Sequence, residues 1–141
     1  MKREGGFLVS KIHQISGRIF FKKLKEKNIE INAAQGRILF VLWKQDNLKI
    51  NELAKRTSLS KTSLTSMLER LELMGYIVKK ESEKDKRSTI ISLTEKNIIL
   101  EDLYKQVSDE MTNLYYKGFT CKEINLFEEY LIRILSNLDS K

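Results

Sequence analysis

The chain has 141 residues, a formal net charge of +7, 41% hydrophobic residues, one cysteine and no proline. Enough apolar residues are present to bury a core, so one globular domain is expected and the disordered and fibrous classes are excluded. The single cysteine excludes an intramolecular disulfide and a cysteine-based zinc site, and no apolar run reaches the roughly 18 residues that a membrane span needs. We expect a cytoplasmic protein, because the N-terminus lacks the apolar segment of a secretion signal.

Two amphipathic helices are predicted at the start of the chain. Apolar residues recur at helical spacing from Phe7 to Leu24. Asn32 is suited to cap a second helix, whose apolar face runs from Ala33 to Leu42. A loop through Asp46 and Asn47 follows. The absence of proline agrees with a chain that is mostly helical.

The next segment has the pattern of a helix-turn-helix. A short helix from Ile50 to Arg56 is followed by a turn through Thr57 and Ser58. Ser60 then caps a second helix, which Gly75 ends. The apolar residues of that helix recur at helical spacing and are Leu64, Met67, Leu68, Leu71 and Met74. Two short helices joined by a tight turn are typical of DNA-reading domains.

After this second helix the pattern changes from helical to extended. Tyr76–Lys80 and Thr89–Leu93 are rich in β-branched and aromatic residues. The polar stretch 81–88 separates them, so the two runs predict a β-hairpin. A charged hairpin that directly follows a helix-turn-helix is typical of a wing.

Two further helices are predicted after the hairpin. Thr94 and Glu95 open a long amphipathic helix that Gly118 ends. Thr120 and Glu123 then form a capping box for a last amphipathic helix.

These elements predict a mainly α fold (α+β) with a small β-hairpin wing, in one domain over residues 1–141. Residues 31–96 form a winged helix-turn-helix, and residues 1–30 and 97–141 form the flanking helices. From residue 97 onward eight acidic residues stand against five basic ones, so the net positive charge lies in the preceding part. A basic folded region is expected of a polyanion binder, although solvated basic surfaces are also common.

The outer face of the helix after Ser60 is the first candidate contact with DNA. If the leucines point inward, about 100° per residue places small hydroxyl side chains on the opposite face. Short side chains permit close approach to base edges in the major groove, whereas a purely solvated helix face usually carries Glu, Lys and Gln. The residues expected to contact DNA from this helix are Ser60, Lys61, Thr62, Ser63, Thr65, Ser66 and Arg70.

The tip of the hairpin is the second candidate contact. Lys84, Asp85, Lys86 and Arg87 combine three cations with one carboxylate. The negative potential of a narrow minor groove favours arginine, and the aspartate could hold the guanidinium in position. An ordinary charged turn is the alternative for this segment taken alone.

A series of segments along the chain resembles the MarR family of bacterial transcription regulators. The segments are Asn32–Leu39, Ile50–Ala54, Ser60–Gly75, Asp85–Arg87 and Ile91–Lys96. The wing motif of the family is an aspartate, one residue, then an arginine, which Asp85 and Arg87 fit. Ser82 and Glu83 stand where many members have a proline, and Asn32 replaces the usual threonine, although asparagine caps a helix as well.

The resemblance implies a homodimer formed by residues 1–30 and 97–141. Each subunit would place its recognition helix in the major groove and its wing in the minor groove. A two-fold dimer would read a pseudo-palindromic operator with half-sites one helical turn apart. The family also implies a repressor, released by a small aromatic or lipophilic effector that binds between the dimerisation helices and the reading part. No cofactor or metal is expected, and no residue is assigned to the effector.

Three alternatives stand beside this interpretation. An enzyme is not expected, because the sequence has no glycine-rich phosphate loop, no paired metal ligands and no nucleophile with a histidine partner. A winged-helix module that binds protein would need an apolar or acidic recognition face. A redox-responsive regulator could act through Cys121, near the start of the last helix, although peroxide-sensing relatives carry their reactive cysteine in the first helix.

Overall fold

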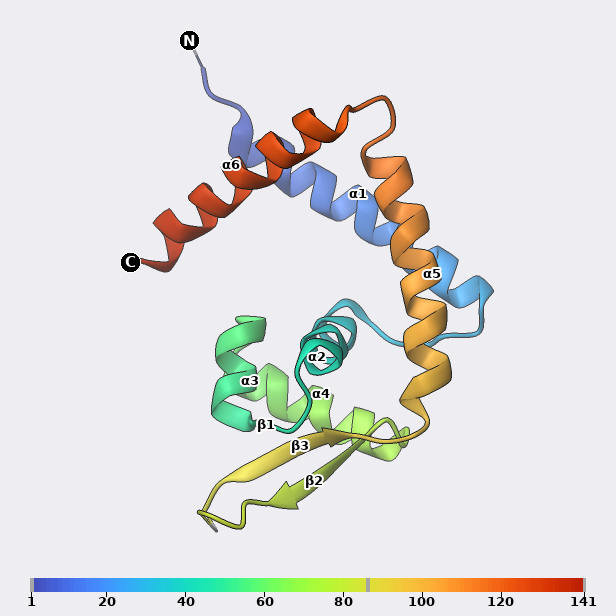
Figure 1. Cartoon of the computed structure of the whole chain (residues 1–141), viewed down its shortest axis with the longest axis vertical. Coiled ribbons are helices and arrows are strands. Elements are labelled where there is room, and N and C mark those ends of the chain that lie inside the picture. The colour runs from blue at the N-terminus through green and yellow to red at the C-terminus, as the bar shows by residue number, and fades with distance from the viewer. Residues whose placement is uncertain (1, 86, 141) are drawn as a thin grey trace. The chain divides into compact units, whose positions relative to one another are not determined.

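The computed structural model describes residues 2–85 and 87–140 and contains helices and a small sheet (Figure 1). In chain order these elements are α1 Gly5–Glu26, α2 Ala33–Lys44, β1 Leu48–Lys49, α3 Ile50–Thr57, α4 Lys61–Leu73, β2 Ile77–Glu81, β3 Thr89–Leu93, α5 Asn97–Tyr115 and α6 Cys121–Asp139. The predicted mainly helical fold with a small wing is confirmed. The chain divides into two compact units, residues 1–107 and residues 108–141.

Helix α2 begins at the predicted cap. The Asn32 side chain accepts a hydrogen bond from the Gln35 backbone N–H at 2.8 Å, and the Gln35 side chain accepts one from the Asn32 N–H at 2.9 Å. This reciprocal capping box satisfies two N–H groups that the start of a helix leaves unpaired. The cap by Asn32 was expected, whereas the return bond to Gln35 was not.

An apolar core holds α2, α3 and α4 against the hairpin, and Figure 1 shows the three helices gathered beside β2 and β3. Its fully buried apolar side chains are Ile38, Leu39, Leu42, Leu53, Leu64, Leu68, Leu71, Ile77 and Ile91. The three leucines of α4 are those predicted to point inward. Burial of a side chain of this size stabilises the fold by about 1.5–3 kcal/mol before the entropy of ordering is subtracted.

The hairpin gains a third strand that the sequence did not predict. β1 pairs antiparallel with β3, which also pairs with β2, so the strand order is β1-β3-β2. Leu48 lies opposite Ile91, and Asp46 Oδ1 accepts a hydrogen bond from the Leu93 N–H at 2.9 Å. A strand of only two residues is too short for an alternating pattern to be visible in the sequence.

Helix α5 begins at Asn97, two residues later than predicted. The Thr94 and Lys96 side chains do not cap it, because they donate hydrogen bonds to backbone carbonyls at the end of α4. Residues 94–98 form a turn instead, in which the Asn97 N–H donates to the Thr94 carbonyl at 3.1 Å.

The first and last helices leave apolar side chains in solvent. On α1, Phe7 is 67% exposed. Helix α6 begins with the predicted capping box of Thr120 and Glu123, yet none of its residues is buried. An amphipathic helix with a solvated apolar face lacks the packing surface that would stabilise it.

Candidate nucleic-acid interface

Helix α4 presents the hydroxyl face expected from its sequence. Ser60 caps the helix, since its Oγ accepts a hydrogen bond from the Ser63 N–H at 3.1 Å. The buried leucines on the opposite side prevent the helix from rotating about its axis. Of the predicted contacts on this helix, the exposed residues are Ser60, Lys61, Thr62, Ser63, Thr65 and Arg70, and Ser66 is half-buried.

A shallow hollow of about 390 Å³ runs along this face. It is lined by Lys61, Thr62, Thr65, Ser66 and Glu69. The Thr65 hydroxyl donates to the Lys61 carbonyl at 2.9 Å, so its oxygen keeps lone pairs for an external donor. The hollow therefore offers hydrogen-bond donors and acceptors together with one cation and one carboxylate.

Glu69 belongs to this face although it was not among the predicted contacts. Its side chain is exposed one helical turn after Thr65, and it forms no ion pair with any residue that the structure describes. A carboxylate accepts a hydrogen bond from the amino group of cytosine and is repelled by phosphate. The helical spacing of about 100° per residue already places Glu69 on the outer face with Thr62 and Thr65, and the shared hollow adds it to the candidate contacts.

Asp85 organises the tip of the wing. Its Oδ1 accepts a hydrogen bond from the Arg87 backbone N–H at 3.0 Å, and its Oδ2 accepts one from the Ser88 hydroxyl at 3.1 Å. Ser82 is buried below the tip, where its Oγ accepts from the Asp85 N–H at 3.4 Å. The aspartate thus holds the backbone of the turn, whereas we expected it to hold the guanidinium of Arg87.

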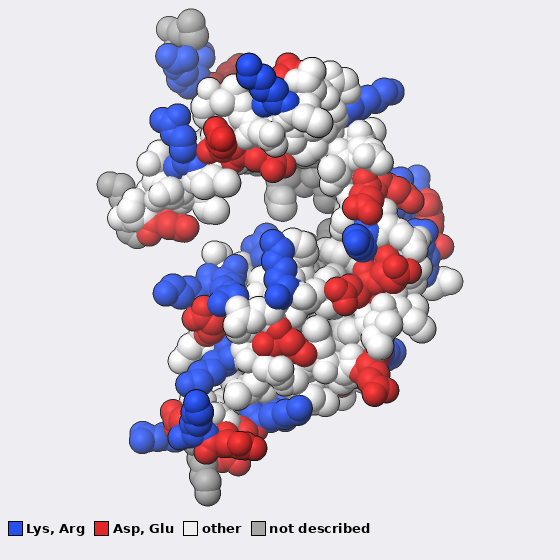
Figure 2. All heavy atoms as spheres, in the orientation of Figure 1, with Lys and Arg blue, Asp and Glu red and all other residues white. Residues whose placement is uncertain are grey.

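Two cations of the wing tip are open to solvent. Lys84 and Arg87 are exposed, and Figure 2 shows positive and negative side chains mixed at this end of the hairpin. Lys86, the remaining predicted contact, lies outside the described residues. The Arg87 guanidinium forms no ion pair with a residue that the structure describes, so it is available to an external acceptor.

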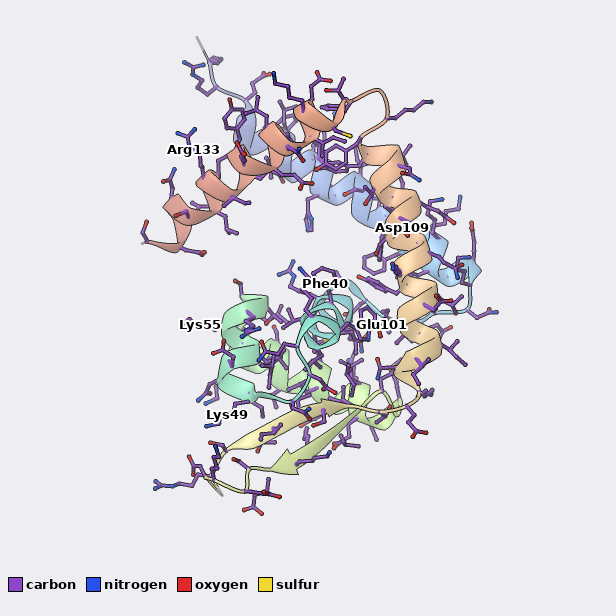
Figure 3. The ribbon with its side chains drawn as sticks, viewed as in Figure 1. Phe40, Lys49, Lys55, Glu101, Asp109 and Arg133 are labelled. Carbon is purple, nitrogen blue, oxygen red and sulfur yellow. The ribbon has the colours of Figure 1, made fainter. Side chains whose placement is uncertain are left out.

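Two exposed cations at the ends of α3 were not predicted as contacts. Lys49 and Lys55, labelled in Figure 3, have no ion-pair partner among the described residues. Arg56 differs, because it pairs with Glu52 at 2.9 Å. The first helix of a helix-turn-helix crosses the DNA backbone, which makes its terminal lysines candidates for phosphate contacts.

A larger open groove of about 710 Å³ lies beside the end of α4, within residues 1–107. Its lining residues are Phe21, Glu30, Ile31, Asn32, Gln35, Arg70, Leu73 and Met74. Leu73 is 88% exposed, and Arg70 brings the guanidinium of a predicted DNA contact to the same groove. The mixture of apolar side chains with one cation and one carboxylate suits a small amphipathic molecule.

Comparison with known proteins assigns the winged helix-turn-helix segment to a family. The model of the MarR family matches residues 31–89. The organic hydroperoxide resistance transcriptional regulator of Bacillus subtilis (strain 168) is 32% identical over 90 residues, which cover 64% of this chain and 60% of that protein. Residues 31–89 belong to the MarR family.

Solved MarR structures share the fold of this chain. A mutant MarR from E. coli complexed with operator DNA has a TM-score of 0.82 at 26% identity, with 92% of each chain covered. A MarR transcriptional regulator from Methanosarcina mazei Go1 has a TM-score of 0.86 at 22% identity and covers 99% of this chain and 100% of its own. The likeness extends over nearly the whole chain.

The matched segment, residues 31–89, is of the type found in MarR winged helix-turn-helix transcription regulators. The chain spans only part of the curated relatives it matches, 52% of an uncharacterised HTH-type regulator and 60% of the hydroperoxide regulator, both of Bacillus subtilis.

Within residues 2–85 and 87–140, no group of three or more His, Cys, Asp and Glu side chains is placed to hold a metal ion. No helix of the same described segments has the length and apolar character to cross a membrane.

Proposed function

We propose that this protein reads duplex DNA sequence-specifically as a homodimer and represses the genes next to its operator, in the cytoplasm. The observation that carries the proposal is the exposed hydroxyl face of α4, held outward by the buried Leu64, Leu68 and Leu71. In this function residues 31–96 are the reading part, and residues 1–30 and 97–141 form the dimerisation part.

The face of α4 suits the major groove. A helix with its side chains is about 10–12 Å wide and enters a groove about 12 Å wide. The hydroxyls of Thr62, Thr65 and Ser66 are short enough to reach base edges, and threonine methyl groups can contact the methyl group of thymine. The first turn of the helix directs backbone N–H groups and a favourable dipole toward phosphate. We assign the phosphate contacts to Ser60, Lys61, Ser63 and Arg70.

The wing tip suits the minor groove. Arg87 is exposed, and the turn that carries it is shaped by the hydrogen bonds of Asp85. Guanidinium groups are attracted to the enhanced negative potential of a narrow minor groove. In the proposal Arg87 enters the groove, Lys84 and Lys86 approach phosphates, and Asp85 shapes the turn.

The exposed apolar residues of α1 and α6 support the homodimer. Phe7 on α1 and Leu138 on α6 are 67% and 66% exposed, and several neighbours on both helices are at least 40% exposed. Apolar surface of this kind is stabilised by burial against a second copy, and a two-fold dimer presents two reading parts to a pseudo-palindromic operator. The E. coli relative was crystallised with operator DNA.

A small aromatic or lipophilic effector is the proposed release signal. The groove beside Leu73 supports this proposal, because a ligand held there would touch Arg70, which the proposal also assigns to DNA. A redox signal through Cys121 is the second candidate, favoured by the exposure of its thiol at the first residue of α6.

Binding to the duplex upstream of its own coding region tests the function. Fluorescence anisotropy at several salt concentrations should show tight binding to this duplex and weak binding to a shuffled duplex of equal composition. The logarithm of the binding constant should fall linearly with the logarithm of salt concentration, because each phosphate contact releases counterions. Equally weak binding to both duplexes would overturn the proposal and favour a winged-helix module that binds protein.

A further inference from the structure

The end of α4 and the start of α5 are joined by side chains that the proposed DNA contacts do not include. The backbone of Met74, Gly75 and Tyr76 connects α4 to β2, and residues 94–97 connect β3 to α5. Figure 1 shows these two connections close together at the base of the hairpin. Each of the three consecutive carbonyls accepts a hydrogen bond from a different side chain of residues 94–97.

Two of these bonds close the end of α4. Lys96 Nζ donates to the Met74 carbonyl at 2.6 Å, and the Thr94 hydroxyl donates to the Gly75 carbonyl at 2.5 Å. The Lys96 ammonium also lies 4.7 Å from the centroid of the Tyr76 ring. The carbonyl of Met74, the C-cap of α4, has no partner within the helix, and the carbonyl of Gly75 lies just beyond it. These two donors therefore satisfy groups that would otherwise need water.

The third bond comes from Asn97, which is only 3% exposed. Its Nδ2 donates to the Tyr76 carbonyl, and its Oδ1 accepts from the Trp43 Nε1 at 3.2 Å. Trp43 belongs to α2, and its ring packs edge-on against Tyr104 of α5 with the centroids 5.0 Å apart. One buried amide therefore links α2, the chain after α4 and the start of α5.

The turn that Asn97 holds sets the direction of the wing. Gly75 has a φ of +83°, a left-handed conformation that side-chain-bearing residues rarely adopt. This conformation ends α4 and leads into β2 within a few residues. The angle between the recognition helix and the wing therefore depends on this turn and on the side chains that fasten it.

We propose that Asn97 is a positioning residue for DNA reading, which holds α4 and the wing at the angle where both contact one duplex at the same time. The proposal rests on the proposed function. Two contacts on a rigid frame bind together more tightly than two contacts that must be aligned on binding, since less freedom is lost. Asn97 acts through the Tyr76 carbonyl and the Trp43 indole and does not itself touch DNA.

A double-mutant cycle between Asn97 and Arg87 tests this coupling. The five residues of β3 lie between them and span about 16 Å at roughly 3.3 Å per residue. At separations beyond about 10 Å, independent substitutions have additive effects. Arg87→Ala is measured in the full-length wild-type and Asn97→Ala proteins, on a duplex that the wild-type protein selects from a random-sequence pool.

We expect Arg87→Ala to weaken binding about tenfold in the wild-type protein and about threefold or less in the Asn97→Ala protein, after correction for the folded fraction. A residue that only stabilises the fold would change the folded fraction and leave the factor for Arg87 unchanged. Equal factors in the two backgrounds therefore overturn the proposal.

A milder variant and a matched control accompany the cycle. Trp43→Phe keeps an aromatic ring against Tyr104 and removes the N–H that Asn97 accepts, together with part of the indole ring. We expect it to reduce the Arg87 effect to a smaller extent. Asn113→Ala removes an exposed amide from the same helix and should leave the Arg87 effect unchanged. If the Asn97→Ala protein does not fold, an undiminished Arg87 effect in Trp43→Phe overturns the proposal.

Failure of the proposed function gives a different result. In that case the wild-type protein selects no duplex from the pool. If the wild-type protein selects a duplex but Arg87→Ala binds it normally, the wing makes no contact with DNA, and there is no second contact for Asn97 to align with α4. That outcome overturns the positioning role and leaves DNA reading by α4 intact.

Discussion

The reading part and the last helix contain similar apolar stripes with opposite outcomes. In α4, Leu64 and Leu71 are completely buried at 0% exposure. In α6 no residue is buried, and Ile134 and Leu135 are 52% and 57% exposed. Both helices are amphipathic, so the pattern alone does not separate them. The difference is that α2, α3 and the hairpin cover the stripe of α4.

This contrast separates two uses of an amphipathic helix. An apolar stripe that other elements of the chain cover stabilises the monomer. An apolar stripe that is exposed to solvent can instead be buried against another molecule, and its burial then stabilises the complex. The reading part is therefore expected to keep its fold without help. The terminal helices are expected to gain their stability from a second copy of the chain.

The largest expected effect concerns this dimer. Leu135→Asp places one carboxylate per subunit in the proposed interface, which should weaken the dimer by about 4 kcal/mol, or about a thousandfold. Sedimentation velocity should show a monomer at concentrations where the wild-type protein is a dimer. Asn125→Asp adds the same charge at another exposed position of α6 and serves as the control. A stable wild-type monomer would contradict the comparison.

The next effect concerns the core of the reading part. Leu71→Ala should lower the free energy of unfolding by about 3 kcal/mol, because it leaves a cavity between packed elements. Leu73→Ala, two residues later in the same helix, should change it by less than about 0.5 kcal/mol, since Leu73 is 88% exposed. Urea unfolding followed by the fluorescence of Trp43 measures both. Similar losses for the two variants would show that the core is not as described.

The wing is expected to contribute less than the core. Arg87→Ala should weaken operator binding about tenfold without dissociating the dimer, because a minor-groove contact is lost. Lys84→Ala should weaken binding to all duplexes similarly and reduce the salt slope by about one. Lys117→Ala, an exposed cation after α5, is the matched control in the same anisotropy assay. Normal binding by the Arg87 variant would remove the wing from the interface.

A smaller effect is expected on the face of α4. Glu69→Gln keeps the shape of the side chain and removes a charge that phosphate repels, so non-specific affinity should rise about twofold to threefold. Repeated selection from a random pool should also show a changed preference at one position in each half-site. An unchanged preference together with unchanged affinity would place Glu69 outside the contact surface.

The smallest expected effect is a pKa shift within residues 108–141, a unit in which no described residue is buried. Desolvation and the Glu128 carboxylate, which accepts a hydrogen bond from the Tyr116 hydroxyl at 2.7 Å, raise the pKa of Tyr116 to about 12. An unfolded tyrosine ionises near pH 10, so this contribution to stability is complete below about pH 10 and is lost between about pH 10 and 12. Glu128→Gln should lower the pKa.

Tyrosine absorbance during an alkaline titration measures this shift, and Tyr116→Phe assigns the signal. A titration curve that Glu128→Gln leaves unchanged would show that the contact does not hold in solution.

Local signals in the sequence were enough for the helices and for most of their ends. Asn32, Ser60 and Thr120 cap helices as predicted, because a cap is a contact between residues three positions apart. Gly75 and Gly118 adopt positive φ values at the ends of α4 and α5, as residues that stop helices do.

Contacts between distant segments were not predictable in the same way. Strand β1 was missed because its two residues pair with β3 far along the chain. The start of α5 was placed too early because Thr94 and Lys96 serve the end of α4 instead. The predicted contact between Asp85 and the Arg87 guanidinium was wrong, since Asp85 accepts hydrogen bonds from the Arg87 N–H and the Ser88 hydroxyl instead. The sequence does not distinguish an ion pair from a hydrogen bond within the turn.

The sequence by itself determined which faces of the helices are apolar and which residues stand on the outer face of α4, since a helical period is a local property. Only the tertiary structure decided which stripes are covered and which polar side chains meet. The hydrogen bond between Trp43 and Asn97, 54 residues apart, depends on how α2, α4 and α5 pack. No local pattern encodes that packing, because it follows from the shape of the whole core.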